Sequence, residues 1–334
     1  MTGNGTAPLL EVENLVTHYP VPRGLVGTLS GRSKLAVRAV DGVTFTLEKG
    51  QMLALVGESG SGKTTTAQTI LRLVDADSGT IRFQGEDISK ASGQRMRALR
   101  RHAQLIFQDP YESLDPRFRV RATVEEPLLV HGEGGSAAER HQLVRDALTR
   151  AGLTPPELFL DRYPHELSGG QRQRVAIAAS LVLGPQLLVA DEPVSMLDVS
   201  VRAGILALLD DLRDSGLGIL MITHDLSTAA HFADRIAVMY LGRIVEEGPA
   251  HEVVNNPKHP YTKALISVVP QPDPRASTEP EILRGETPNP VNIPPGCRFN
   301  PRCPIAIPEC REIDPELRSP AGAPAGHLAA CIRA

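Results

Sequence analysis

Residues 52–64 of the chain read Met-Leu-Ala-Leu-Val-Gly-Glu-Ser-Gly-Ser-Gly-Lys-Thr, and this stretch decides the fold. Its first part, Met52–Val56, is a short apolar run typical of a buried strand. The second part, Gly57–Thr64, has the spacing G-x-x-x-x-G-K-T, and a helical pattern from about Lys63 to Val74 follows it. A strand before this motif and a helix after it form the context in which such a loop cradles phosphates. The stretch therefore predicts a nucleoside triphosphate site in an α/β domain.

Different residues of this loop are expected to contact different parts of the triphosphate. The glycines let backbone N–H groups turn inward around the β-phosphate, and the helix N-terminus adds the positive end of its dipole. Lys63 supplies a positive charge for the β- and γ-phosphates, and the Thr64 hydroxyl is a candidate ligand for Mg²⁺. The residues expected to bind the nucleotide here are Gly57, Ser59, Gly60, Ser61, Gly62, Lys63, Thr64 and Thr65. A chance glycine-rich turn is the alternative, and the flanking strand and helix argue against it.

Two further strand ends carry polar residues suited to phosphate chemistry. The apolar run Leu187–Ala190 ends in Asp191 and Glu192. At the carboxyl end of a parallel strand, Asp191 is placed to hold Mg²⁺, directly or through water, and Glu192 is the candidate general base for an attacking water. His224 directly follows the apolar run Gly218–Thr223. A solvated strand end and a structural histidine are the alternative interpretations of these two places.

Strand-like and helical patterns alternate from about residue 48 to 250, which predicts an α/β domain with a largely parallel sheet. The clearest strands are Met52–Val56, Gln104–Phe107, Leu187–Ala190, Gly218–Thr223 and Arg235–Tyr240. Two more strand-like runs, Leu9–His18 and Val37–Leu47, flank a glycine-rich, basic loop at residues 20–36.

Charge and apolar patterning argue against a nucleic-acid binder, a membrane-spanning protein and a secreted protein. The chain has 334 residues, with 35 Lys+Arg against 39 Asp+Glu and a net charge of −4. This mildly acidic balance disfavours a general nucleic-acid binder, so no nucleic-acid partner is expected. No apolar run approaches the roughly 18 residues of a membrane-spanning helix, and the N-terminal residues lack the charged start and apolar core of a secretory signal. We therefore expect a cytosolic protein.

A second anion-binding segment, Leu167–Gln171, reads Leu-Ser-Gly-Gly-Gln and opens a predicted helix. Its residues Ser168, Gly169, Gly170 and Gln171 would present backbone donors and a helix dipole to an anion. Because the phosphate loop already cradles one triphosphate, this second site suggests contact with another subunit's nucleotide. With these motifs, the sequence resembles the ATP-binding subunits of ABC transporters over roughly residues 9–265.

The resemblance implies a P-loop NTPase fold of the ABC nucleotide-binding type. Such a domain has a mostly parallel sheet core, an antiparallel β subdomain and a helical subdomain, here at about residues 109–180. In the family, two such domains sandwich two ATP molecules head to tail, and each ATP contacts one chain's phosphate loop and the other chain's Leu-Ser-Gly-Gly-Gln segment.

The resemblance also assigns roles to single residues. Tyr19 is similar to the aromatic residue that stacks on adenine, although it could instead be a packed strand residue. Gln108 matches the glutamine that touches Mg²⁺ and senses the γ-phosphate, and Asp198 lies in the loop that crosses the dimer interface. His224 matches the histidine that contacts the γ-phosphate and orients water. With Glu192 also present, this chain's own site is expected to be hydrolytic.

Two segments narrow the resemblance to the peptide and nickel importer subfamily. They are residues 108–117, Gln-Asp-Pro-Tyr-Glu-Ser-Leu-Asp-Pro-Arg, and residues 256–262, Asn-Pro-Lys-His-Pro-Tyr-Thr. The insertion at 20–36 resembles the second of the two ATPases in dipeptide and oligopeptide importers. The implied partners are a homologous second ATPase subunit in a heterodimer, two membrane permeases, and an extracytoplasmic substrate-binding protein. The implied location is the cytoplasmic face of the inner membrane, with Asp109–Arg119 as the permease docking segment, although its aromatics Tyr111 and Phe118 could instead pack in the core.

The last part of the chain, residues 266–334, is expected to be a separate extension. Its prolines exclude long helices, and its few apolar residues suggest that a crosslink or a metal holds its shape. It contains all four cysteines, Cys297, Cys303, Cys310 and Cys331, spaced C-x5-C-x6-C-x20-C. Four thiolates suit a [4Fe–4S] cluster or one Zn²⁺, and free thiols are the third possibility. The resemblance to peptide-importer ATPases favours the [4Fe–4S] cluster.

The leading hypothesis is an ATPase that drives import of di- or oligopeptides. An importer of nickel chelates or of another solute, such as a cell-wall peptide, is an alternative. So are a soluble ABC ATPase acting on nucleic acid or the ribosome, and a metal-sensing regulator built on an ATPase.

Overall fold

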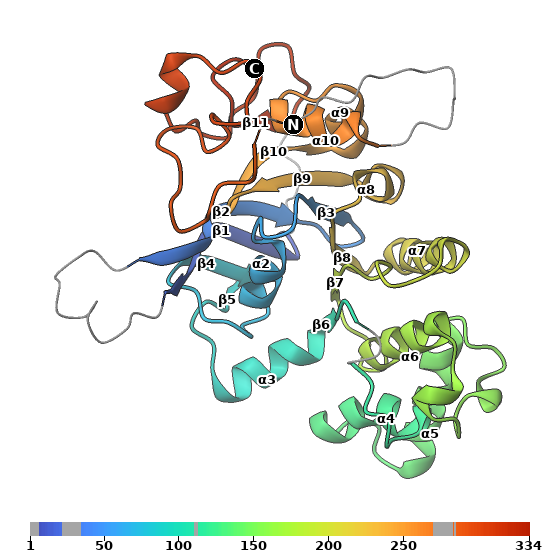
Figure 1. Ribbon diagram of the computed structural model, residues 1–334. Coiled ribbons are helices and arrows are strands. Elements are labelled where there is room, and N and C mark those ends of the chain that lie inside the picture. Colours follow the sequence, from blue (N-terminus) through green and yellow to red (C-terminus); the bar gives the residue numbers. More distant parts are fainter. Residues whose placement is uncertain (1–6, 22–34, 110–112, 270–282, 284) are drawn as a thin grey trace, which may run out of the picture. The chain divides into compact units, whose positions relative to one another are not determined.

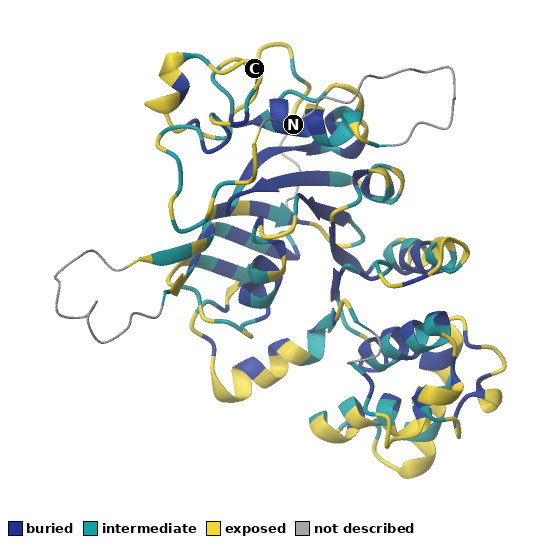
Figure 2. Cartoon of the chain, in the orientation of Figure 1, coloured by how far each residue is buried: buried dark blue, intermediate teal, exposed yellow. Residues whose placement is uncertain are grey.

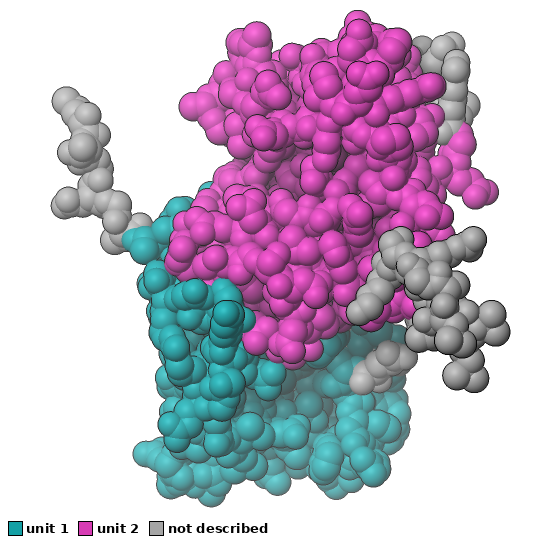
Figure 3. All heavy atoms as spheres, turned by 90° about the vertical axis from the view of Figure 1, so that its left-hand side faces the viewer, with its two compact units in different colours: residues 1–10, 47–52, 83–222 teal, residues 11–46, 53–82, 223–334 magenta. Residues whose placement is uncertain are grey.

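The computed structural model describes residues 7–21, 35–109, 113–269, 283 and 285–334. The chain forms two compact units that alternate along the sequence (Figure 3). Unit 1 comprises Met1–Leu10, Leu47–Met52 and Phe83–Ile222, and unit 2 comprises Glu11–Thr46, Leu53–Arg82 and Thr223–Ala334. Most of the predicted insertion at 20–36, Tyr111 of the predicted docking segment, and several tail prolines lie outside the described residues.

Unit 1 contains three parallel strands in the order β8 (Gly218–Thr223), β7 (Leu187–Asp191) and β6 (Ala103–Ile106). Both β7 and β8 are buried at every position. Burial on both faces explains why the sequence shows them as unbroken apolar runs rather than as alternating patterns. Because parallel strands share a carboxyl edge, the segments that begin at Phe107 and Glu192 leave this sheet on the same side.

Helices connect these strands. α3 (Gly93–His102) leads directly into β6, and α7 (Val199–Asp214) joins β7 to β8. Along α7 the residues Ile205, Leu209 and Leu212 are buried, which is the spacing of one helix face. A two-residue strand, β5 (Glu86–Asp87), precedes α3.

A group of helices separates β6 from β7 in the sequence (Figure 1). It contains α4 (Val120–His131), α5 (Ala137–Arg150), the 3₁₀ turns η1 (Pro156–Leu158) and η2 (Pro164–Glu166), and α6 (Gly169–Leu181). The three α-helices pack on one another. Figure 2 shows buried and exposed residues on opposite sides of these helices, as expected of amphipathic elements.

Most of a second sheet lies in unit 2, where β2 (Ala36–Leu47), β1 (Leu10–Pro20) and β4 (Ser78–Phe83) are neighbours in that order. Along β1, buried and less buried residues alternate on either side of Asn14, which has a φ of 47°. This period of two is typical of a strand that covers a core with one face.

Four other strands of unit 2 are neighbours in the order β3 (Met52–Val56), β9 (Arg235–Tyr240), β10 (Arg243–Pro249) and β11 (Leu328–Ala329). β3 and β9 are parallel, whereas β9, β10 and β11 pair antiparallel. The C-terminal extension therefore adds a strand to the group that includes the strand before the phosphate loop. The helices of unit 2 are α2 (Lys63–Ile70), α8 (Leu226–Phe232), α9 (Ala250–Asn255) and α10 (Pro260–Ser267).

The predicted strands are confirmed to within two residues, but the helix after the phosphate loop is shorter than predicted. α2 ends at Ile70 and not at Val74. Arg72 has a φ of 54°, and the N–H groups of Leu73 and Val74 both donate to the carbonyl of Gln68. A residue in the left-handed region cannot continue a right-handed helix, so the chain turns away here.

The described part of the tail, residues 283 and 285–334, contains only η3 (Pro308–Arg311) and β11 as regular elements. This agrees with the expectation that its prolines prevent long helices. Among the helices that the structure describes, none is both long enough and apolar enough to cross a membrane.

Candidate nucleotide site and thiol pocket

The phosphate loop runs from β3 to α2 through two glycines that have no room for a side chain. A Cβ at Gly57 would lie 2.2 Å from the carbonyl oxygen of Met239, and a Cβ at Gly62 would lie 1.9 Å from that of Ala39. Gly62 also has a φ of 108°, in the left-handed region that favours glycine. The two glycines of the motif are therefore required by local packing as well as by backbone conformation.

Lys63 lies inside the curve of this loop and is only 5% exposed. Its ammonium group donates to the carbonyl oxygens of Gly57 and Glu58 at 2.8 and 2.9 Å. The N-terminus of α2 has no side-chain cap, and its first turn has no acidic residue. A buried ammonium beside a helix N-terminus that lacks a side-chain cap favours an anion.

The other predicted residues of the loop lie on its more accessible parts. Ser59, Gly60 and Thr64 are exposed, Thr65 is half-buried, and Ser61 is buried. Ser61 Oγ lies 3.4 Å from the Lys63 ammonium. Unit 2 therefore brings the predicted phosphate-binding residues together in one loop.

In unit 1, the structure brings Gln108 and Glu192 together. The amide nitrogen Nε2 of Gln108 donates to Oε2 of Glu192 at 2.9 Å. Glu192 follows β7 with a φ of 46°, and its N–H donates to the Ile222 carbonyl at 2.9 Å. The N–H and hydroxyl of Ser195 donate in turn to the Glu192 carbonyl. A carboxylate fixed in this way is a suitable acceptor for a proton from water.

The remaining acids of this region occupy different environments. Asp191 ends β7 and is 7% exposed. Asp198 is exposed and is the N-cap residue of α7. The neighbouring Met196 and Val199 are strongly exposed apolar residues, 58% and 80%. Such a pair on the surface is compatible with the interface segment that the resemblance implies.

The Leu-Ser-Gly-Gly-Gln segment forms the start of α6 through a capping box. Ser168 Oγ accepts from the N–H of Gln171, and Gln171 Oε1 accepts from the N–H of Ser168. Gly169 is half-buried, and a Cβ at Gly170 would lie 2.4 Å from a methyl group of Val201. The pattern therefore has a local structural role here in addition to any contact with a second subunit.

Two predicted residues of unit 2 stand at element ends. His224 is an exposed residue between β8 and α8. The next residue, Asp225, caps α8; burial alone would raise its pKa, but hydrogen bonds from Ser227 and Thr228 hold that pKa below the ordinary value. Tyr19 lies near the end of β1 with 39% of its surface exposed. Its ring is accessible enough for stacking.

The four cysteines line one pocket in the C-terminal extension, together with His259 and Phe299. None forms a disulfide. Burial, with smaller contributions from the other three thiols, raises the pKa of Cys297 to about 11. Within the part of the chain that the structure describes, no group of three or more Cys, His, Asp or Glu side chains is arranged to hold a metal ion. The residues therefore have the donor chemistry of a metal site but not its coordination geometry.

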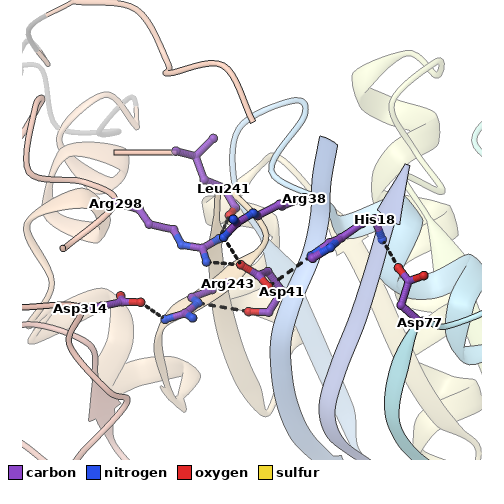
Figure 4. A network of polar contacts seen from close by, with 8 residues as sticks. All are labelled: His18, Arg38, Asp41, Asp77, Leu241, Arg243, Arg298 and Asp314. Carbon is purple, nitrogen blue, oxygen red and sulfur yellow. Dashed lines mark hydrogen bonds and ion pairs between the residues drawn. The ribbon is translucent and has the colours of Figure 1, made fainter. Parts of the chain in front are cut away.

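Sequence reasoning missed the arginines that join the extension to the rest of unit 2. Figure 4 shows Arg298 bonded to the carboxylate of Asp41 and to the carbonyl of Leu241. Burial alone would raise the pKa of Asp41, but hydrogen bonds from Arg298 and His18 and the charge of Arg243 lower it. The other arginine, Arg302, contacts the phosphate loop. The only sequence signal was that each of the two arginines adjoins a cysteine.

Comparison with known proteins finds relatives over nearly the whole chain. A family model described as ABC transporter matches residues 40–195, and one described as oligopeptide/dipeptide transporter, C-terminal region, matches residues 245–310. The oligopeptide transport ATP-binding protein AppF of Bacillus subtilis is 44% identical over 99% of both chains. A putative peptide import ATP-binding protein of Brucella ovis is 46% identical over 98% of both chains. The dipeptide transport ATP-binding protein DppF of Haemophilus influenzae is 44% identical over 97% of this chain and 96% of its own.

Solved structures match about three-quarters of the chain, at lower sequence identity than these relatives. The dimeric ATP-binding cassette MJ0796, in a post-hydrolysis state bound to ADP and Pi, has a TM-score of 0.63 and 27% identity. The match covers 72% of this chain and 99% of that one. The cbiO1 protein of Clostridium perfringens, part of the ABC transporter complex cbiONQ, has a TM-score of 0.63 and 30% identity, over 75% of this chain and 91% of its own.

Proposed function

The chain belongs to the ABC transporter family of ATP-binding proteins, and we propose that it is the ATP-hydrolysing subunit of an importer for di- or oligopeptides. The predicted ABC ATPase fold is confirmed by the family match and by the solved cassettes. The observation that carries the proposal is the phosphate loop, in which a buried lysine lies beside an uncapped helix N-terminus. The extension supports the peptide class, because it matches the C-terminal region of oligopeptide and dipeptide transporters.

The residues proposed to act on the nucleotide have distinct roles. Lys63 and the N-terminus of α2 would bind the β- and γ-phosphates. Glu192, held by Gln108, would accept a proton from the attacking water, and His224 would contact the γ-phosphate. Tyr19 would stack on the adenine ring.

Magnesium fits the oxygen donors that the chain offers. Thr64 supplies a hydroxyl at the start of α2, Asp191 a carboxylate at the end of β7, and Gln108 an amide oxygen, and Mg²⁺ prefers such oxygen ligands. When bound, Mg²⁺ would neutralise part of the charge on the phosphate oxygens.

Assembly is proposed on the same basis. Because Ser168, Gly169, Gly170, Gln171 and Asp198 are expected to face a partner's nucleotide, the active form would be a dimer with a homologous second ATPase. Two permeases and an extracytoplasmic binding protein would complete the importer, and this chain would lie on the cytoplasmic face of the membrane. Segment 109–119 would contact a permease.

The test is nucleotide binding and hydrolysis by three forms of the chain: wild type, Lys63→Ala and Glu192→Gln. We expect Glu192→Gln to bind ATP with Mg²⁺ as tightly as wild type and to lose about 100-fold or more of its hydrolysis rate. Lys63→Ala should lose affinity for ATP. Full hydrolysis by Glu192→Gln would contradict the assignment of the base.

For the thiol pocket we propose a [4Fe–4S] cluster held by Cys297, Cys303, Cys310 and Cys331, with Zn²⁺ as the second candidate. The support is that all four thiols line one pocket and are close enough to affect one another's ionisation. Loading requires the thiols to lose their protons and to move into coordination positions.

Metal and acid-labile sulfide analysis of protein purified without oxygen tests this proposal, with Cys303→Ser as the matched variant. About four iron and four sulfide per chain, lost in the variant, would support the cluster. One zinc without sulfide would support a structural zinc site. If the protein contains neither iron nor zinc, the proposal is overturned and the four cysteines are free thiols.

A further inference from the structure

The phosphate loop is attached to the C-terminal extension through the side chain of Glu58. Glu58 is the second residue of the loop and occupies one of the variable positions of the motif. Arg302 donates from Nη1 to Oε2 at 3.0 Å and from Nη2 to Oε1 at 3.2 Å. The hydroxyl of Thr287 donates to Oε2 at 2.6 Å. Two separate segments of the extension thus hold one carboxylate of the loop.

The backbone of the same residue is held by α10. The N–H of Glu58 donates to the hydroxyl of Tyr261 at 2.9 Å. Tyr261 is fully buried, and its ring lies 4.7 Å from that of Tyr240 and 5.5 Å from that of Phe299. Packed aromatic rings have few alternative rotamers, so this hydroxyl is a fixed acceptor.

The Arg302 contact is charged and largely withdrawn from water. Its side chain is 9% exposed and that of Glu58 is 28% exposed. An arginine guanidinium is charged at every physiological pH, so this contact is an ion pair. A planar guanidinium that makes two hydrogen bonds fixes the direction of a carboxylate, which an ammonium does not.

The other side of Glu58 faces the phosphate-binding lysine. The Glu58 carbonyl accepts from the Lys63 ammonium at 2.9 Å and from the N–H of Ser61 at 3.2 Å. A shift of Glu58 therefore moves both an acceptor of Lys63 and the first turn of the loop. Preorganisation of such a loop contributes to affinity because less ordering remains to be done on binding.

We propose that Arg302 and Tyr261 are positioning residues for the phosphate loop, acting through Glu58, so that ATP affinity depends on the docked C-terminal extension. This inference rests on the proposed binding of ATP by the loop. It makes that function depend on Tyr261 and Arg302, which lie 203 and 244 positions after Glu58 in the sequence.

The test compares Arg302→Lys with Asp314→Asn in the full-length chain. Asp314 also links the extension to the rest of unit 2, but its partner is Arg243 of β10 and not the loop. We expect Arg302→Lys to raise the Kd and KM for ATP with Mg²⁺ about tenfold while kcat changes less than about twofold. Asp314→Asn should leave all three unchanged. Glu58→Gln should raise the Kd for ATP as Arg302→Lys does. The double variant should bind ATP no more weakly than either single variant, because both substitutions remove the same contact.

Wild-type affinity in Arg302→Lys, or an equal loss in Asp314→Asn, would overturn the inference. Absence of ATP binding by wild type would instead defeat the proposed function, so the two failures are distinguishable. If Arg302→Lys does not fold, Thr287→Val replaces it, because Thr287 is exposed and contacts the same carboxylate. A Thr287→Val variant that binds ATP several-fold more weakly supports the inference, and unchanged binding contradicts it.

Discussion

Glu192 has a φ of 46°, a conformation that costs a residue other than glycine about 1–2 kcal/mol. Its N–H bond to Ile222 and the two bonds from Ser195 to its carbonyl hold the residue in that conformation. Backbone strain of this kind often occurs at functional positions, where it aims a side chain. Gln108 then fixes the carboxylate itself. At the residue scale, the proposed base is thus positioned by its own backbone and by one amide.

Gln108→Ala tests that positioning. The variant removes the amide donor to Glu192 without changing the proposed base or the phosphate loop. We expect kcat for ATP hydrolysis to fall about tenfold to 100-fold, because general-base catalysis depends on geometry. The Kd for ATP measured without Mg²⁺ should stay within about threefold of wild type, because the phosphate loop is unchanged. Steady-state ATPase kinetics and equilibrium nucleotide binding measure the two quantities. A pure loss of affinity at unchanged kcat would contradict the role.

At the scale of elements, the start of α2 depends on tight contacts and not on capping. Gly62 is the N-cap residue and offers no side-chain acceptor to the helix. The backbone at Gly62 instead packs closely against Ala39. Because no side chain caps this helix N-terminus, its N–H groups suit an anion. α10 is different, because its N-cap residue His259 accepts the N–H of Tyr261 through Nδ1 at 3.1 Å.

Two glycines of the phosphate loop give a matched pair of substitutions. Both have positive φ, but a Cβ at Gly62 would overlap the Ala39 carbonyl, whereas a Cβ at Gly60 meets nothing within 4 Å. We expect Gly62→Ala to lower the free energy of unfolding by about 2–4 kcal/mol and Gly60→Ala by about 1 kcal/mol. Urea denaturation measures both values. Equal losses would show that the close approach to Ala39 is unimportant.

The His259 cap makes stability depend on pH. Burial, with the charge of Lys263, lowers the pKa of His259 to about 3, whereas an unfolded histidine has a pKa of about 6.5. Below about pH 6.5 the unfolded chain binds a proton that the folded chain excludes. The His259 contribution is therefore complete above pH 6.5 and is lost as the pH falls toward about 3, at about 1.4 kcal/mol per pH unit.

His259→Asn should keep an acceptor for the start of α10 and remove this titration. We expect the free energy of unfolding of the variant to fall less steeply than that of wild type between about pH 6 and pH 4. Denaturation curves at several pH values measure the slopes. Parallel curves for the two proteins would contradict the assignment.

On the scale of the whole molecule, the C-terminal extension is built into unit 2. β11 pairs with β10, and the buried His327 bonds to the buried Glu246 at 2.7 Å between Nε2 and Oε1. Glu246 also accepts the N–H groups of Lys258 and His259, so one carboxylate joins the extension to the segment before α10. Leaving one partner of a buried hydrogen bond unsatisfied costs about 1–3 kcal/mol. The extension therefore belongs to the same compact unit as the phosphate loop.

Much of this arrangement was predictable from the sequence, for identifiable physical reasons. β7 and β8 are buried on both faces, so their apolar runs are unambiguous. The phosphate loop was predictable because its backbone needs glycine at Gly57 and Gly62. The predicted end of α2 was wrong. The local sequence has the pattern of a continuous helix, and nothing in it indicates the positive φ of Arg72.

The contacts of the extension could not be predicted. Glu58 and Arg302 lie 244 residues apart, and Glu246 and His327 lie 81 residues apart. Charged residues in a sequence are usually solvated, so only the folded chain shows which of them are paired. The spacing of the cysteines also does not distinguish a [4Fe–4S] cluster, a Zn²⁺ ion and free thiols.

Peptide uptake by cells that lack this chain tests the central claim most directly. Cells with the gene deleted would receive either the wild-type chain or Glu192→Gln, at matched expression and with ATP binding verified for both. We predict that the wild type restores accumulation of a labelled di- or oligopeptide and that Glu192→Gln does not. Restoration by Glu192→Gln at the wild-type rate, or undiminished uptake in the deleted cells, would contradict the account.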